Sequence, residues 1–206
     1  MTRKLAQFIS AVLHPVFIPV LAVLSLTHFH FLTASKLIPE RKWLFIAAYS
    51  LSLTIVPLMG TALMLRKYTF KELSHLTTQE RVSSAFVMAG IYFFIAFTFQ
   101  TLFLDQLMKA FVIAIGFSAL TLSMVSRYFK ISFHTFGWAG MLVLMLAIAQ
   151  NAVFNMGFVV VAVFILTALV AWARLRLGAH SHREVYAGFI FGLLCNAVVY
   201  LIFYGV

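Results

Sequence analysis

The sequence predicts an all-α fold, a polytopic bundle of about seven transmembrane helices. Of its 206 residues, 64% are hydrophobic and only 10% are charged, and the mean hydropathy is +1.05. A soluble domain carries roughly a quarter charged residues and about half apolar ones. Because so few polar residues cannot cover a water-facing surface, we predict that lipid is the solvent for most of the chain.

Seven apolar stretches are long enough to cross a bilayer. A spanning helix needs about 20 residues, because each residue rises about 1.5 Å and the hydrocarbon is about 30 Å thick. Six spans are the alternative, with one stretch not crossing. No soluble domain is indicated, so we expect residues 1–206 to form a single transmembrane domain. The predicted spans are Phe8–Phe31, Trp43–Leu65, Val82–Phe103, Leu107–Val125, Thr135–Ala152, Met156–Ala173 and Val185–Tyr204.

Seven spans place successive connections on alternate membrane faces. The face that holds the amino terminus and residues 66–81, 126–134 and 174–184 is called face A, and the opposite face is called face B. Face A carries eleven of the fifteen Lys and Arg residues, and face B carries four. This excess predicts that face A lies in the cytoplasm. We expect an integral protein of the bacterial cytoplasmic (inner) membrane.

The net charge of +10 calls for anionic partners. The chain has no run of five or more Lys and Arg and little chain outside the spans, so we expect no nucleic-acid partner. Phosphate-bearing membrane lipids are the expected counterpart. The sequence does not indicate an oligomeric state.

The connection before the last predicted span carries three groups suited to phosphate chemistry. Arg174, His180 and Glu184 follow one another at intervals of six and four residues. If Glu184 opens the last helix, its carboxylate can hold one imidazole nitrogen of His180 and leave the other free as nucleophile or base. The Arg174 guanidinium presents a fork of donors that fits phosphate oxygens. Taken singly, the three have simpler interpretations: an anchoring arginine, a polar loop histidine and a carboxylate at a helix amino terminus.

Two further stretches on face A carry polar groups. Lys130, Ser132 and His134 precede the fifth predicted span, where a hydroxyl and an imidazole two residues apart can contact one anion. The alternative is that Ser132 caps the helix and His134 is interfacial. Arg81 stands just before the third span, where a lone arginine is typically a headgroup anchor.

Together these stretches resemble the type 2 phosphatidic acid phosphatase superfamily, the integral membrane lipid phosphate phosphatases. That family has three motifs, Lys-x6-Arg-Pro, Pro-Ser-Gly-His and Ser-Arg-x5-His-x3-Asp. The third corresponds here to residues 173–184, the second to residues 131–134, and the first is reduced to Arg81 and Val82. The motif order matches, and the resemblance covers the chain from about residue 81 to residue 206.

The resemblance implies a metal-independent and cofactor-free reaction on a lipid phosphate or diphosphate. Many bacterial members of the resembled family work on the outer side of the membrane, which is the alternative to the cytoplasmic site that the charge excess on face A predicts. By position, His180 attacks phosphorus, Glu184 orients it and His134 protonates the leaving oxygen. This agrees with the physical requirement of phosphoryl transfer for positioning and positive charge. The implied phosphate ligands are Arg81, Ser132 and Arg174, with Lys71 or Lys130 as a candidate substitute for a missing lysine.

The chain also departs from the family pattern. The first-motif lysine falls at Ser74, Phe133 stands in place of a glycine, Glu184 replaces an aspartate and Ala173 replaces a serine. These departures favour one alternative, a degenerate member that binds or moves anionic lipids without catalysis.

A small transporter subunit is another alternative. Its pathway candidates are the polar residues within spans, which are His14, Gln150, Asn151 and Asn196. His14, just before Pro15, is either functional or satisfied by a neighbouring carbonyl. Gly188 and Gly192 form a small-xxx-small pair that predicts close helix packing.

Overall fold

The structure, a computed structural model, describes residues 2–29, 39–65, 77–99, 105–150, 152 and 154–205. Within these ranges, seven helical stretches are long and apolar enough to cross a membrane, the first formed by α1, η1 and α2 together. The predicted polytopic helical bundle is therefore confirmed. The helices are α1 (Thr2–Val12), η1 (Pro15–Phe17), α2 (Ile18–Phe29), η2 (Pro39–Arg41), α4 (Lys42–Met64), α5 (Thr78–Phe99), α6 (Gln106–Ser126), α7 (Phe133–Gln150), α8 (Gly157–Arg176) and α9 (His182–Phe203).

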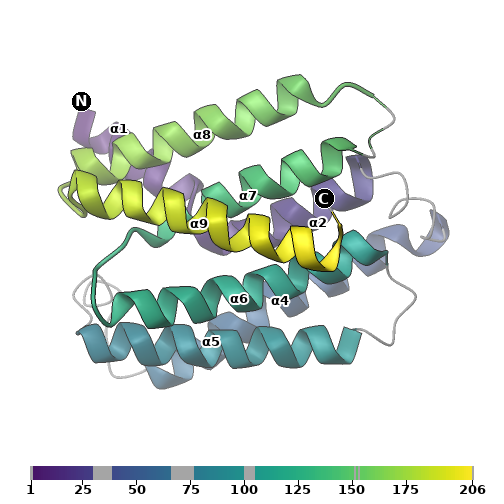
Figure 1. The fold of residues 1–206 in the computed structure, drawn as a ribbon, viewed down its shortest axis with the longest axis horizontal. Coiled ribbons are helices and arrows are strands. Elements are labelled where there is room, and N and C mark those ends of the chain that lie inside the picture. The colour runs from purple at the N-terminus through teal and green to yellow at the C-terminus, as the bar shows by residue number, and fades with distance from the viewer. Residues whose placement is uncertain are drawn as a thin grey trace.

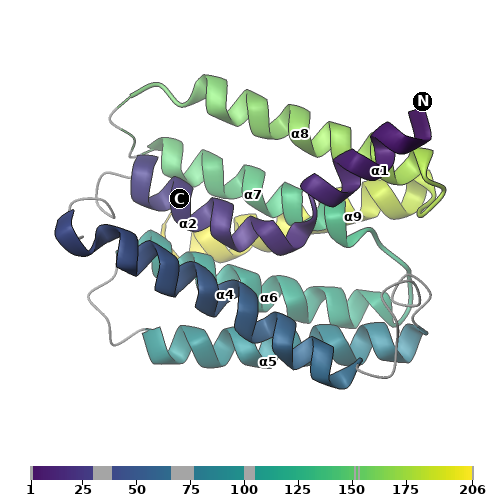
Figure 2. The same cartoon turned by 180° about the vertical axis from the view of Figure 1, so that it is seen from behind.

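Helix α7 lies at the centre of the bundle. It packs against α9, α8, α2 and α6, and its Phe136, Trp138 and Ile148 are fully buried. Figures 1 and 2 place α8 and α1 at one edge of the bundle and α5 at the opposite edge. The two termini lie towards opposite ends, as an odd number of spans requires.

The outside of the bundle is apolar. On α5, Phe86, Phe94 and Phe97 are each more than 60% exposed, and they share one face of the helix. In water such a face would be a large exposed hydrophobic patch, whereas in a bilayer it contacts lipid chains. Together with the seven apolar helices, it identifies an integral membrane protein.

The first span is broken, where the sequence predicted one continuous helix. His14 is extended, with φ −66° and ψ 136°, because the residue before a proline avoids the helical region and Pro15 lacks an amide proton. The break sends α1 towards α8, and α2 towards α4 and α7. The Leu13 carbonyl next to the break accepts a hydrogen bond from Trp138 Nε1 at 2.8 Å, so a neighbouring helix satisfies this backbone group within the membrane.

Among the helices that begin on face A earlier than the apolar pattern predicted, two start with a capping box. Helix α5 starts at Thr78 and not at Val82, and α9 starts at His182 and not at Val185. Each start is a capping box, in which a hydroxyl and a Glu carboxylate exchange hydrogen bonds with backbone amides three residues apart. Hydropathy misses such starts because the capping residues are polar.

Close packing joins α9 to α7. A Cβ placed on Gly188 would lie 2.6 Å from both the Ser132 carbonyl and Thr135 Oγ1. A Cβ on Gly192 would overlap the Phe136 carbonyl. The predicted packing role of this glycine pair is confirmed, and it brings the amino-terminal ends of the two helices together on face A.

Candidate functional site

The connection between α8 and α9 is a tight turn that presents His180. Helix α8 ends in a Schellman motif, in which Gly178 takes φ +67° and the Ala179 amide donates to the Arg174 carbonyl at 3.2 Å. Three residues later, Ser181 caps α9. Because both ends of the turn are held by hydrogen bonds, the position of His180 is fixed relative to both helices.

His180 and Glu184 form a hydrogen-bonded pair. The distance from His180 Nδ1 to Glu184 Oε2 is 2.8 Å, and their side chains are 10% and 19% exposed. The same carboxylate oxygen accepts from the Ser181 amide at 3.2 Å. Glu184 therefore caps the helix and holds the imidazole at once, so the two interpretations of this residue are not exclusive. With Nδ1 occupied, Nε2 is the nitrogen left to react.

The charge state of His180 suits a nucleophile. Burial lowers the pKa of His180 from its usual value of 6.5, and the positive charges of Arg174 and Lys130 lower it further. The hydrogen bond and negative charge of Glu184 act in the opposite direction. The net direction is downward, so the ring is neutral at pH 7.

The amino-terminal end of α7 is clamped beside this pair. The Ser132 amide donates to the Glu184 carbonyl at 3.1 Å, and Thr135 Oγ1 donates to the Val185 carbonyl at 3.1 Å. The Ser132 hydroxyl accepts from the Thr135 amide at 3.4 Å, and Ser132 is fully buried. The structure therefore shows Ser132 as the cap of α7, which was the alternative interpretation of this residue.

His134 is buried rather than interfacial. It lies in the first turn of α7 and is 8% exposed. Arg174, His14 and His180 all act electrostatically on its ring. Among the described residues, its Nε2 has no hydrogen-bond partner. A buried nitrogen without a partner is unusual in folded proteins and points to a ligand or a catalytic role.

Arg174 lies in the last turn of α8, although the sequence placed it in the connection. Its Nη1 donates to Ser10 Oγ on α1 at 2.9 Å. Its Nε is buried and has no partner among the described residues. A guanidinium with a spare buried donor, next to two imidazoles, is suited to bind an anion.

Lys130 connects the two face-A turns. Its Nζ donates to the Ala179 carbonyl at 3.3 Å, next to His180. Its charge acts on His180. The structure therefore brings Lys130 next to His180.

The broken first span contributes two residues to this cluster. The His14 ring lies edge-on to the His134 ring, with a centroid distance of 4.9 Å, and its Nδ1 accepts from the Val16 amide at 3.3 Å. Ser10 holds Arg174. The His14-Pro15 pair was a visible signal of a helix break at a polar residue. No feature of the sequence singled out Ser10.

Arg81, another predicted phosphate ligand, makes its hydrogen bonds within its own helix. It is in the first turn of α5, and its Nη2 donates to Thr78 Oγ1 at 3.4 Å. Helix α5 packs against α6 and α4, at the edge of the bundle opposite α8. Its Nε is buried without a partner in the described part of the chain. Ser74, at the position of the first-motif lysine, and Lys71, a candidate substitute for that lysine, lie outside the described residues.

A cavity of about 300 Å³ adjoins the histidine cluster. His14 and Phe133 line it, together with mainly apolar side chains from α2, α4, α5, α6, α7 and α9. Asn196 also lines it and is satisfied by Ser118 Oγ at 3.1 Å and the Gly192 carbonyl at 2.9 Å. That bonding favours a structural role for Asn196 over a transport pathway.

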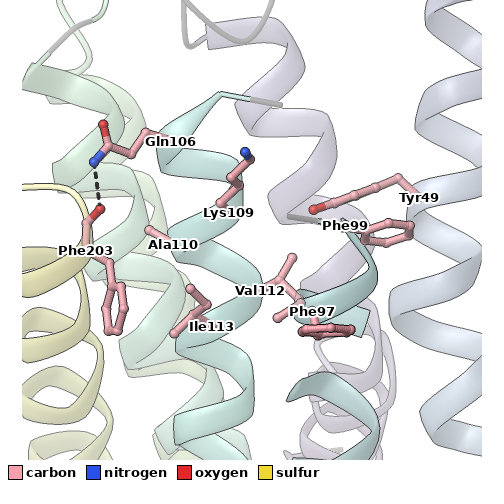
Figure 3. A pocket seen from close by; sticks show the side chains of 10 residues that line it. Tyr49, Phe97, Phe99, Gln106, Lys109, Ala110, Val112, Ile113 and Phe203 are labelled. Atoms are coloured by element: carbon pink, nitrogen blue, oxygen red, sulfur yellow. Dashed lines mark hydrogen bonds between the residues drawn. The ribbon is translucent and has the colours of Figure 1, made fainter. Parts of the chain in front are cut away.

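A second cavity, of about 400 Å³, lies at the face-B end between α4, α5, α6 and the end of α9 (Figure 3). Gln106 Nε2 donates to the Phe203 carbonyl at 3.1 Å along one side, and Tyr49 reaches in from α4. The described residues that line it include no histidine or carboxylate. Because Gln106 begins α6 and the cluster lies near the opposite end of that helix, this cavity is separate from the face-A site.

The described residues contain no group of three or more His, Cys, Asp and Glu side chains placed to hold a metal ion.

The fold and the cluster define the class of protein: an integral membrane helical bundle with a His–Glu pair, a second buried histidine and two basic side chains at one end. Comparisons with protein families, curated proteins and solved structures find no match.

Proposed function

We propose that the protein hydrolyses the phosphate ester of a membrane lipid through a phosphohistidine intermediate on His180, as a member of the type 2 phosphatidic acid phosphatase superfamily. The observation that carries the proposal is the 2.8 Å bond between His180 Nδ1 and Glu184, beside two buried nitrogens without partners, Arg174 Nε and His134 Nε2. A phosphoryl group offers several acceptor oxygens and one electrophilic phosphorus, which matches this set of groups.

In the first step, His180 Nε2 attacks phosphorus as the bond to the lipid oxygen breaks. The negative charge of the bound phosphate ester keeps His134 protonated, the leaving oxygen takes this proton, and the lipid departs as an alcohol. Arg174 and Lys130 stabilise the charge on the phosphoryl oxygens, because fixed donors in a water-poor site need little reorganisation during the reaction. Glu184 holds the ring in the reactive tautomer and stabilises the positive charge that develops on it.

In the second step, water attacks the phosphohistidine. The nitrogen–phosphorus bond breaks, inorganic phosphate leaves, and the neutral His134 accepts a proton from the water. Both histidines return to their initial states. The basic side chains supply the positive charge, so we expect the reaction to proceed without added metal.

A lipid is the expected substrate because the cluster is built from helix ends at a membrane face. His134 and Arg174 lie in the terminal turns of membrane-spanning helices, at the depth of lipid headgroups. The proposed site consists of His180, Glu184, His134, Arg174 and Lys130. Ser132 contributes by capping α7, and Arg81 is left outside the proposed site.

The test is phosphate release from a panel of lipid phosphates by the purified protein in detergent with a chelator present. His180→Ala should abolish release, and His134→Ala should lower the rate by about 10²–10⁴-fold through lost proton transfer. The matched control is His182→Ala, because His182 is exposed and lies two residues further on. Wild-type turnover by His180→Ala would refute the mechanism.

A second candidate function is the binding of anionic lipids without turnover. Arg81, one of the predicted phosphate ligands, favours it, since the hydrogen bond of its guanidinium is to Thr78 of its own helix and not to a residue of the cluster. The two candidates differ in one result. A lipid phosphate that binds in an Arg174-dependent way and is never hydrolysed would favour binding alone.

A further inference from the structure

The cavity of about 300 Å³ beside the histidine cluster has walls suited to hydrocarbon. It lies within the membrane-spanning part of the bundle, between α2 and α4 on one side and α5, α6, α7 and α9 on the other. Its volume is at the lower end of the range for small-molecule pockets. A space of that size and character has room for a hydrocarbon chain.

The cavity begins where the cluster ends. His14 lines the cavity and also contacts the His134 ring at a centroid distance of 4.9 Å. Phe133, which lines the cavity, immediately precedes His134 on α7. A molecule with its polar end at His180 and His134 can therefore place its next atoms past His14 and into the cavity.

Two prolines shape the walls of this space. Pro15 breaks the first span, so that α2 diverges from α1, and Pro57 lies within α4. The Leu53 carbonyl, which Pro57 cannot pair with, accepts from Tyr92 Oη at 3.1 Å. Because this carbonyl and that of Leu13 are satisfied by side chains of neighbouring helices, the helices depart from regular packing without exposing these backbone groups. Broken helices of this kind often border binding sites in membrane proteins.

We infer that this cavity binds a hydrocarbon chain of the substrate, so that the preferred substrate class is a lipid phosphate with at least one long chain. The inference rests on the proposed function, because that function places the phosphate at the cluster. The occupant is hydrocarbon because the cavity lies among membrane spans, its lining is mainly apolar, and it continues from the phosphate site. For a substrate that starts as a monomer in water, each buried methylene should raise kcat/KM by about fourfold until the cavity is full.

The first experiment uses monoalkyl phosphates that differ only in chain length, at a fixed detergent concentration. Ala119 is buried and lines the cavity, so Ala119→Phe should fill part of it. Relative to wild type, kcat/KM should fall tenfold or more on long chains and stay unchanged on the shortest. Ala168→Phe is the matched control, because Ala168 is exposed on α8. Comparing variant with wild type at each length removes the effect of partitioning into micelles.

Thr54→Phe fills the same cavity from α4 and serves if Ala119→Phe does not fold. If a folded variant with a filled cavity shows the same dependence of kcat/KM on chain length as the wild-type protein, the inference is overturned.

A second experiment needs no turnover. An alkylphosphonate, which cannot be hydrolysed, carries a photoreactive diazirine at the end of its chain and is cross-linked to the wild-type protein. Labels on cavity-lining residues of α4 and α6 support the chain site, whereas labels confined to the lipid-facing surface overturn it. If no lipid phosphate is hydrolysed and the label still reaches the cavity, the phosphatase proposal fails and the chain site stands. If lipid phosphates are hydrolysed and the label lies elsewhere, the chain site fails and the phosphatase proposal stands.

Discussion

Gly188→Ala tests whether close packing of α9 on α7 positions the candidate site. The new Cβ would lie 2.6 Å from the Ser132 carbonyl oxygen and from Thr135 Oγ1. Ordinary contact needs about 3.5 Å, so the helices must separate locally by roughly 1 Å. Overpacking of this kind costs about 1–3 kcal/mol.

The matched control is Gly90→Ala. Gly90 lies within α5, and a Cβ there would meet no atom within 4 Å. Both variants gain the same helix propensity of about 1 kcal/mol, so the difference between them isolates the contact at Gly188. For a chain of this size, about 1 kcal/mol corresponds to 2–4 °C in Tm. We therefore expect Gly188→Ala to melt roughly 2–12 °C below Gly90→Ala.

The single cysteine allows a simple assay. Cys195 on α9 is partly buried, and its Sγ lies 3.4 Å from Thr121 Oγ1. A thiol-reactive fluorogenic dye will react with it as the bundle opens on heating. Equal Tm values for Gly188→Ala and Gly90→Ala would refute the argument that this contact is tight.

The displacement of α9 in Gly188→Ala should also lower the rate of phosphate release. The bonds from the Ser132 amide and Thr135 Oγ1 to the start of α9 place Glu184, and Glu184 places His180. A 1 Å misplacement of reacting groups costs on the order of 10²-fold in rate. Gly188→Ala should thus lower phosphate release by about that factor at a temperature where the protein is folded, while Gly90→Ala keeps wild-type activity.

The remaining predictions concern charge. Because kcat/KM reports the free protein, its acidic limb should follow the pKa of His180 and lie below pH 6.5. Lys130→Gln removes a positive charge, which raises the pKa of His180 and should move this limb to higher pH. Glu184→Gln removes the carboxylate, which lowers that pKa and should move the limb to lower pH. Shifts of the same sign in the two variants would contradict the assignment of the limb to His180. The excess of Lys and Arg on face A predicts a cytoplasmic amino terminus and an outward carboxyl terminus. A carboxyl-terminal fusion should therefore activate a periplasmic reporter, and activation of a cytoplasmic one would show that face A is outward.

The His180–Glu184 pair was predictable from sequence because its geometry is local. Four residues separate the two side chains, and the Ser181-x-x-Glu184 signature marks the helix start between them. A helix start of known type fixes which groups face one another. The same reasoning does not extend to Arg81, since topology assigns a residue to a membrane face and not to a position across the bundle. Helix α5 begins on face A and lies at the edge opposite α8.

The sequence by itself determined that this protein is a bundle of seven apolar helices, because lipid requires each span to satisfy its own backbone and leaves a clear hydropathy signal. It also determined which polar groups share face A. Only the tertiary structure decided which of them meet. Ser10 reaches Arg174 across 164 residues, and His14 reaches His134 because Pro15 turns the chain at that point. Such contacts depend on how helices pack side by side, and in a membrane that packing is set by shape and hydrogen bonds between residues distant in sequence.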